Sequence, residues 1–219
     1  MNIVPSHIMA SVQMRSLSWI LLSGSLIICF LSVTETSRAQ VTPPITSSGL
    51  STTITQNGNA YDITGGTRPE NGFNLFHSFG DFGVPTNNIA NFLNETGLPT
   101  NNILGRVTGG NPSNIFGSVQ TTGFDNANLF LMNPAGFLFG PNATVNVGGM
   151  MAFTSADYLK LMDNARFNAI PNASADALLT ASPVAAFHFL GENPSAIAVQ
   201  GSQLTLANGT GLSLVGGNR

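Results

Sequence analysis

Short runs that alternate apolar and polar residues predict β-strands over most of this chain. The pattern is clearest in Asn126–Gly149, where the apolar runs Leu129–Met132 and Phe137–Phe139 precede the strictly alternating run Ala143–Val147. A period of two indicates a strand with one buried face. The runs are separated by Asn-Pro-Ala-Gly and Gly-Pro-Asn, and these residues favour tight turns. The segment therefore predicts three short strands joined by two sharp corners.

A hairpin is predicted nearer the N-terminus. Ser51–Thr55 and Ala60–Thr64 flank the sequence Gln-Asn-Gly-Asn, and Asn-Gly between two alternating runs is typical of a hairpin turn. The run Gly72–Val84 alternates aromatic and polar residues, which predicts strands with one buried face. Further strands are expected at Ile103–Thr108, Ile115–Val119 and Val184–Leu190.

Two regions are less regular. The apolar cluster within Pro85–Asn102 fits either one short helical turn or a loop folded over the core. The apolar spacing in Ala156–Ala169 is compatible with a short helix, and Ala175–Ala181 is a second helix candidate.

The C-terminal part shows a repeating pattern. Three apolar runs, Ile197–Val199, Leu204–Leu206 and Leu212–Val215, start seven and eight residues apart and are separated by Gly- and Asn-containing turns. Short strands at such spacing predict a solenoid, in which each strand stacks on an equivalent strand one coil away. Inward side chains then form apolar rows, and Asn side chains at the corners hydrogen-bond in register.

A solenoid has unpaired strand edges only at its two ends. We expect the hairpin region Gln40–Thr64 to cap the N-terminal end. No cap follows the last predicted strand at Gly216–Arg219. We therefore expect this chain to be the N-terminal fragment of a longer protein.

Composition supports an all-β protein with many turns. The chain holds 24 Asn and 24 Gly, whereas only 8% of its 219 residues are charged, compared with about 25% in an average domain. Helical surfaces use Glu, Lys and Arg, so their scarcity argues against a helical fold. The formal charge of −3, with no basic run, argues against nucleic-acid binding.

The N-terminal residues resemble an export signal. Met1–Arg15 precedes the 15-residue apolar run Trp19–Val33, and Ser-Arg-Ala follows at Ser37–Ala39. The run is shorter than the roughly 20 residues of a membrane span. We expect cleavage after Ala39, which divides the chain into a signal peptide, 1–39, and one domain, 40–219. An uncleaved N-terminal anchor is the alternative. The single cysteine, Cys29, lies in this segment, so we expect no disulfide and no thiolate metal site.

Candidate chemistry is sparse. His77 lies four residues before Asp81, and a His/Asp pair can act as a general base or hold a metal. No companion ligand motif accompanies it, so we interpret His77 as a partly buried, hydrogen-bonded side chain and His188 as a residue at the surface or core edge. We therefore predict no catalytic, cofactor-binding or metal-binding residue.

Polysaccharide lyases and hydrolases also use parallel β-helices, and a carbohydrate-active enzyme is the alternative function. Such enzymes need clustered carboxylates, whereas the acidic residues here are dispersed. Asp157 and Asp163 are the closest pair in the C-terminal half, and Asp157 is expected to cap a turn or helix. Arg106 is a possible anion-binding residue, although an outward-facing strand arginine is the favoured interpretation.

Three ordered motifs carry a family resemblance. Asn128–Gly140 resembles the segment NLFLINPNGIIFG, Arg106–Gly117 is similar to RVTGGNPSNIxG, and Gly72–Phe79 is similar to a run containing NLFHSF. The three segments that they resemble are those of the two-partner secretion domain, or haemagglutination activity domain, of filamentous-haemagglutinin-like bacterial exoproteins. The resemblance extends over about Ile45–Val215.

The resemblance implies a right-handed parallel β-helix with an N-terminal cap and extra-helical strands. It implies a non-enzymatic domain that enters the periplasm and is recognised by the POTRA-type periplasmic domains of a dedicated outer-membrane β-barrel transporter. The exoprotein then reaches the cell surface or the extracellular space. A downstream fibre would bind host or cell-surface glycans or proteins. A self-standing adhesin is a third possibility, which the uncapped end disfavours.

The Asn-Pro turns within these motifs are the candidate site. They either contact the transporter or set the corners of the coil, and the second role is favoured because Pro fixes φ and Asn bonds its own backbone. The sequence departs from the family pattern at Ala135 and Phe137, which replace Asn and Ile. The candidate residues are Asn111, Pro112, Asn114, Asn133, Pro134, Gly136 and Arg106.

Overall fold

A computed structural model describes residues 44–202, 204, 206 and 209–217. By contacts the chain divides into two units, Met1–Gln40 and Val41–Arg219, and the description below concerns the second. The predicted signal peptide, 1–39, lies outside the described residues. Within the described ranges, no helix is long and apolar enough to cross a membrane.

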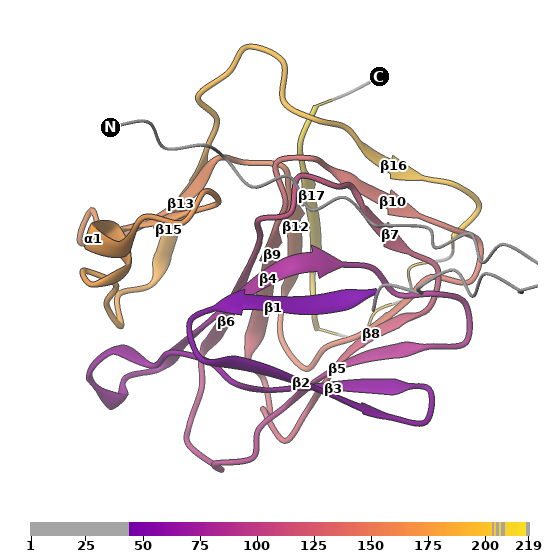
Figure 1. Ribbon diagram of the computed structural model, residues 1–219, viewed down its shortest axis with the longest axis horizontal. Coiled ribbons are helices and arrows are strands. Elements are labelled where there is room, and N and C mark those ends of the chain that lie inside the picture. Colours follow the sequence, from indigo (N-terminus) through magenta and orange to yellow (C-terminus); the bar gives the residue numbers. More distant parts are fainter. Residues whose placement is uncertain (1–43, 203, 205, 207–208, 218–219) are drawn as a thin grey trace, which may run out of the picture. The chain divides into compact units, whose positions relative to one another are not determined.

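Four β-sheets make up the described part (Figure 1). The six-stranded sheet has the order β1 (Ile45–Gly49), β4 (Asn74–Phe82), β6 (Asn102–Val107), β9 (Asn128–Met132), β12 (Met151–Thr154) and β17 (Leu212–Val215). The five-stranded sheet has the order β11 (Thr144–Asn146), β8 (Ser118–Thr122), β5 (Ile89–Leu93), β3 (Ala60–Gly65) and β2 (Thr52–Asn57). The short parallel sheet consists of β16 (Ile197–Val199), β10 (Phe137–Phe139) and β7 (Ser113–Ile115). The extra-helical sheet consists of β14 (Arg166–Asn168), β13 (Tyr158–Leu161) and β15 (Val184–His188).

The first three sheets are the sides of a parallel β-solenoid. Strands β6, β7 and β8 form one coil, and β9, β10 and β11 form the next, with each strand paired in parallel to its equivalent. In the preceding coil, β4 and β5 flank Val84, which forms a single bridge to Ile115. The predicted solenoid and the three strands of Asn126–Gly149 are confirmed.

Antiparallel strands cover the N-terminal end of the solenoid. β1 pairs with β4, and β2 pairs with β3 in the predicted hairpin, whose turn residue Gly58 has a φ of +60°. Each of the two large sheets therefore begins with an antiparallel strand in front of its first parallel strand. The predicted cap is confirmed.

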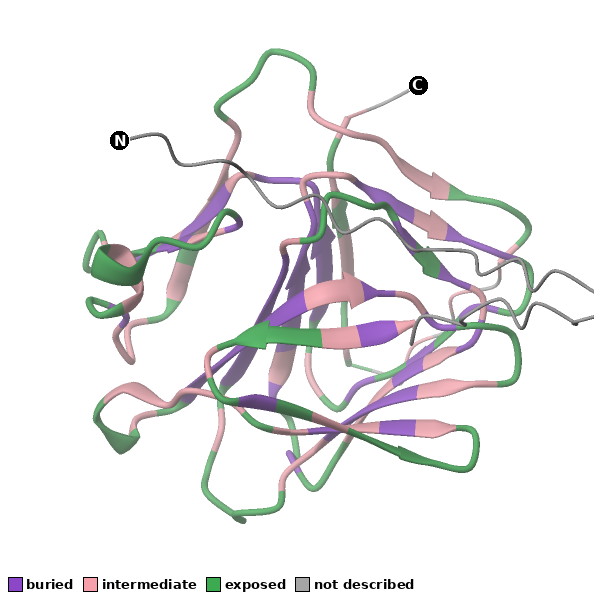
Figure 2. Cartoon of the chain, viewed as in Figure 1, coloured by how far each residue is buried: buried purple, intermediate pink, exposed green. Residues whose placement is uncertain are grey.

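The inner strands β4, β6, β9 and β12 of the six-stranded sheet bury residues on both faces, as Figure 2 shows. Ile103 and Val107 of β6 lie in the core inside the solenoid, whereas Leu104 lies in a second core on the opposite face. There Leu159 and Phe167 of the extra-helical sheet pack against it. The predicted single buried face for Gly72–Val84 is therefore wrong, because the extra-helical sheet covers the side that the alternation assigned to solvent.

Several local predictions also need correction. Pro85–Asn102 contains strand β5 instead of a helical turn or a loop, and Ala156–Ala169 contains β13 and β14 instead of a helix. Ile115–Val119 is broken between β7 and β8 by a corner at Gly117, where a Cβ would lie 2.2 Å from the carbonyl oxygen of Asn88. Two short helical elements are present in the described residues. The helix α1 (Ala173–Asp176) begins before the predicted Ala175–Ala181, and the 3-10 turn η1 spans Pro69–Asn71. The predicted strand Leu204–Leu206 lies partly outside the described residues.

A ladder of asparagine side chains links successive coils, as predicted. Asn102 Nδ2 donates to Asn74 Oδ1 at 2.9 Å, and Asn128 Nδ2 donates to Asn102 Oδ1 at 3.0 Å. The backbone N–H of Met150 continues the series by donating to Asn128 Oδ1 at 2.9 Å. The rungs are 28, 26 and 22 residues apart, so the ladder fixes the register of coils of unequal length.

Replacing the middle rung tests this role. Asn102→Ala leaves polar atoms of Asn74 and Asn128 without their partner, and each buried unsatisfied group costs about 1–3 kcal/mol. We expect the free energy of unfolding, measured by urea titration with circular dichroism, to fall by about 2–3 kcal/mol. Asn146→Ala is the control, because Asn146 is an exposed strand residue of β11. Equal effects at the two positions would contradict the ladder.

Candidate functional site

Six of the seven candidate residues gather at one corner, where the chain leaves the six-stranded sheet for the short parallel sheet. Asn133 organises this corner and is 1% exposed. Its Nδ2 donates to the carbonyl of Asn111 and to Ser113 Oγ, both at 2.9 Å, and its Oδ1 accepts from the backbone N–H of Ala135 at 2.9 Å. The side chain of Asn133 therefore joins two successive coils and also shapes its own turn.

Gly136 completes the same turn in a conformation that favours glycine. Its φ is +92°, and an added Cβ would lie 2.3 Å from the carbonyl oxygen of Ala196 in the next coil. Its N–H donates to the carbonyl of Asn133 at 2.9 Å, and its carbonyl accepts from the N–H of Ser113 at 3.0 Å. Pro134 between them is half-buried. The turn Asn133–Gly136 is therefore packed on both sides by neighbouring coils.

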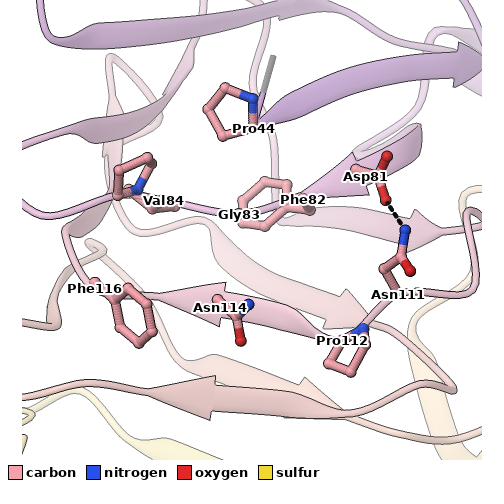
Figure 3. A pocket seen from close by; sticks show the side chains of 10 residues that line it. Pro44, Asp81, Phe82, Gly83, Val84, Asn111, Pro112, Asn114 and Phe116 are labelled. Atoms are coloured by element: carbon pink, nitrogen blue, oxygen red, sulfur yellow. Dashed lines mark hydrogen bonds between the residues drawn. The ribbon is translucent and has the colours of Figure 1, made fainter. Parts of the chain in front are cut away.

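The preceding turn is open to solvent and borders a hollow that we call the corner groove (Figure 3). Asn111, Pro112 and Asn114 are all exposed, and Asn111 Nδ2 donates to Asp81 Oδ1 at 3.0 Å. The groove has a volume of about 410 Å³. Its lining comprises Pro44, Asp81, Phe82, Gly83, Val84, Pro85, Asn111, Pro112, Asn114 and Phe116.

The groove exists because the short parallel sheet is incomplete at its first coil. Later coils contribute three-residue strands there, whereas the first coil contributes only Val84. The N–H of Val84 donates to the carbonyl of Asn114 at 2.9 Å, and its carbonyl accepts from the N–H of Phe116 at 2.7 Å. Pro85 follows and has no N–H to continue the ladder. Because the first coil has no strand at this position beyond Val84, Phe116 and Asn114 lie at an open edge of the sheet.

Arg106 lies apart from this corner. It points outward from the solenoid, as expected, but it is only 2% exposed, because the second core covers this side of the sheet. Its guanidinium donates to both carboxylate oxygens of Asp176 at 2.7 Å, to Ser78 Oγ at 2.9 Å and to the carbonyl of Asn168 at 3.1 Å. It also lies 5.2 Å from the ring centroid of Phe167. The anion that Arg106 binds is therefore a carboxylate of this chain, and the ion pair fixes α1 against the six-stranded sheet.

Both histidines contact neighbouring side chains of the fold. His77 is 1% exposed, and its Nδ1 lies 3.2 Å from Thr52 Oγ1. Burial, and secondarily the positive charge of Arg68, lower the pKa of His77 to about 3. The carboxylate of Asp81 instead accepts from Asn111. His188 is half-buried and stacks on the ring of Tyr158.

The aspartates of the C-terminal half serve separate segments. Asp157 Oδ2 accepts from the backbone N–H of Leu190 at 2.6 Å, so the predicted cap of its own turn or helix is wrong. Asp163 accepts from Thr180 Oγ1 at 2.6 Å, and this hydrogen bond lowers the pKa of Asp163. Over the described ranges, no group of three or more His, Cys, Asp or Glu residues could hold a metal ion.

By its architecture the protein is a capped parallel β-solenoid that carries the extra-helical antiparallel sheet on one side and an exposed Asn-Pro corner. Residues 39–219 match the family model described as the TPS secretion domain. The chain therefore belongs to the family of two-partner secretion domains, as the three sequence motifs indicated. No curated protein matches the chain.

The buried His77 predicts a pH dependence of stability. Its folded pKa is about 3, whereas an unfolded histidine has a pKa of about 6.5. Between these values the unfolded state binds the extra proton, so stability falls as the pH decreases from about 6.5 towards 3, by up to about 1.4 kcal/mol per pH unit. We expect urea unfolding at pH 5 and pH 7 to show a smaller pH effect in His77→Gln than in the wild type. Identical pH dependence in both proteins would refute this assignment.

Proposed function

We propose that this chain is the secretion-targeting domain of an exported, adhesin-like exoprotein. Membership of the TPS family establishes a secretion-related role in the two-partner pathway, which pairs an exoprotein with an outer-membrane transporter. The match over residues 39–219 is the observation that carries this proposal. In the proposed function, residues 1–39 direct export to the periplasm and are removed. POTRA-type periplasmic domains of the β-barrel transporter then recognise the domain, and the exoprotein passes to the cell surface or beyond.

The corner groove is the proposed contact with the transporter. The exposed Asn111, Pro112 and Asn114 form its rim, and the buried Phe82 and Val84 lie at its base. Amides around an apolar floor suit the docking of a short protein segment, because the amides orient the segment while the floor excludes water. The second turn, centred on the buried Asn133, holds this rim in place.

The proposed role also includes nucleation of folding. β1 and β2 cover the first parallel strands of the two large sheets, so new coils add at the opposite end. A chain that emerges from the transporter then folds coil by coil on this template. Free energy released by folding outside the cell biases movement outward.

A pair of matched substitutions tests recognition separately from folding. Asn114→Lys places a long cationic side chain at the rim of the groove, and Asn146→Lys makes the same change at an exposed position of β11. We expect Asn114→Lys to reduce transporter-dependent secretion about tenfold, which corresponds to about 1.4 kcal/mol of recognition. Both variants should unfold at the wild-type urea concentration. Secretion is measured by immunoblot of culture supernatant, with a strain lacking the transporter as the background.

The contrasting variant is Asn133→Ala, which removes the bonds between coils and should lower stability as well as secretion. Wild-type secretion of Asn114→Lys would exclude the groove as the contact. Secretion without any transporter would overturn the proposed function itself.

A further inference from the structure

The extra-helical sheet has one face in the second core and one face turned outward. Leu159, Phe167 and Phe187 belong to the second core. Because strand residues alternate between faces, their neighbours lie on the outer face. We call the group Tyr158, Lys160, Arg166 and His188 the lateral cationic face.

This face places two like charges opposite each other. Lys160 on β13 pairs directly with Arg166 on β14, and like charges in this position destabilise a sheet. Among the described residues, the only ion pair is formed by Arg106 and Asp176, so neither Lys160 nor Arg166 has a carboxylate partner. The whole chain has only 7 basic residues. Two of them are thus held together at a cost that an external anion would offset.

The arrangement is also preorganised. The guanidinium of Arg166 lies 4.6 Å from the ring centroid of Tyr158. His188 stacks on the same ring with centroids 4.6 Å apart and an interplanar angle of 2°. β14 and β15 flank β13 on opposite sides, so Tyr158 lies between the two side chains and is only 7% exposed. Stacking restricts Arg166 before a ligand arrives, which reduces the entropy lost on binding.

Exposed apolar side chains lie at both ends of the face. Met162, two residues after Lys160, is 69% exposed. At the other end, Ile170 and Leu190 are 80% and 78% exposed and line a shallow hollow of about 300 Å³ together with Asp157. A ligand that fits this surface therefore combines an anionic group with flanking apolar groups.

We propose that the lateral cationic face docks an acidic segment of the transporter's periplasmic part, with a carboxylate bound between Lys160 and Arg166. This inference rests on the proposed function and adds a second contact to the corner groove. The net charge around the face favours a protein over a membrane as its occupant. The segment 157–166 that carries both cations also holds Asp157 and Asp163, so its formal net charge is zero. An anionic membrane attracts basic clusters through their summed charge, whereas a single carboxylate needs only the close pair.

The test measures binding of the intact domain to the purified periplasmic domains of its transporter by calorimetry at several salt concentrations. Neutralisation in Lys160→Gln/Arg166→Gln should weaken binding about tenfold at low salt and flatten the salt dependence, because charged contacts control both. Lys160→Arg keeps both charges and the contact between Arg166 and Tyr158, and it should bind as the wild type does. Thr53→Glu/Thr55→Glu is the matched control, because it changes net charge by the same amount on the exposed side of β2.

The outcomes separate the two proposals. If the wild type does not bind the periplasmic domains, the proposed function fails, and this inference fails with it. If the wild type binds and the neutralised variant binds equally at every salt concentration, only this inference is overturned. Vesicles containing phosphatidylglycerol provide the third arm. Vesicle binding that the substitutions abolish, with transporter binding unchanged, would assign the face to a membrane and overturn the inference.

Folding of the variants is checked by thermal unfolding. Neutralisation removes the repulsion between Lys160 and Arg166, so the unfolding temperature should not fall. If the double variant does not fold, Lys160→Gln alone carries the test. It retains the contact between Arg166 and Tyr158 and should still weaken binding and flatten its salt dependence.

Discussion

Burial of the inner strands of the six-stranded sheet, β4, β6, β9 and β12, on both faces is the constraint on which the rest of the structure depends. On the inner side, the rings of Phe79 and Phe82 lie 5.0 Å apart and those of Phe79 and Phe92 lie 6.1 Å apart. On the outer side, Phe76 meets Phe167 of the extra-helical sheet at 5.1 Å. The solenoid and the extra-helical sheet therefore pack on opposite faces of the same strands, which form a shared wall. Removing either core would expose apolar residues that the other side of the same strands cannot cover.

Strands that are shielded from water on both faces need a hydrogen-bond partner for every polar group. The asparagine ladder meets this need along one edge, where each amide both donates and accepts. Arg106 meets it across the wall by bonding Ser78, Asn168 and Asp176. A buried ion pair contributes little net stability, but loss of one partner leaves an uncompensated charge. The pair therefore enforces one position of α1 and the lateral sheet on the solenoid.

Local sequence patterns were sufficient for the coils and insufficient for the lateral sheet. Asn-Gly at the hairpin, and Asn133 with Gly136 at the corner, encode their turns through their own backbone preferences, so these elements were predicted. The alternation rule does not predict the second core, although the adjacent apolar residues Ile103 and Leu104 of β6 lie on opposite faces of the strand and indicate burial on both sides. Arg106 and Asp176 are 70 residues apart, and no local pattern relates them. The candidate turns were found by resemblance, but only packing of neighbouring coils distinguishes the buried Asn133 from the exposed Asn114.

The central claim is that solenoid and lateral sheet form one cooperative unit through their shared wall. Hydrogen exchange followed by mass spectrometry on the intact domain tests it directly. The account predicts that amides of β13 exchange with the same opening free energy as those of β6 and β9, because neither core survives without the other. Fast exchange in β13–β15, with β6 and β9 still protected, would show that the lateral sheet opens independently and would contradict the account.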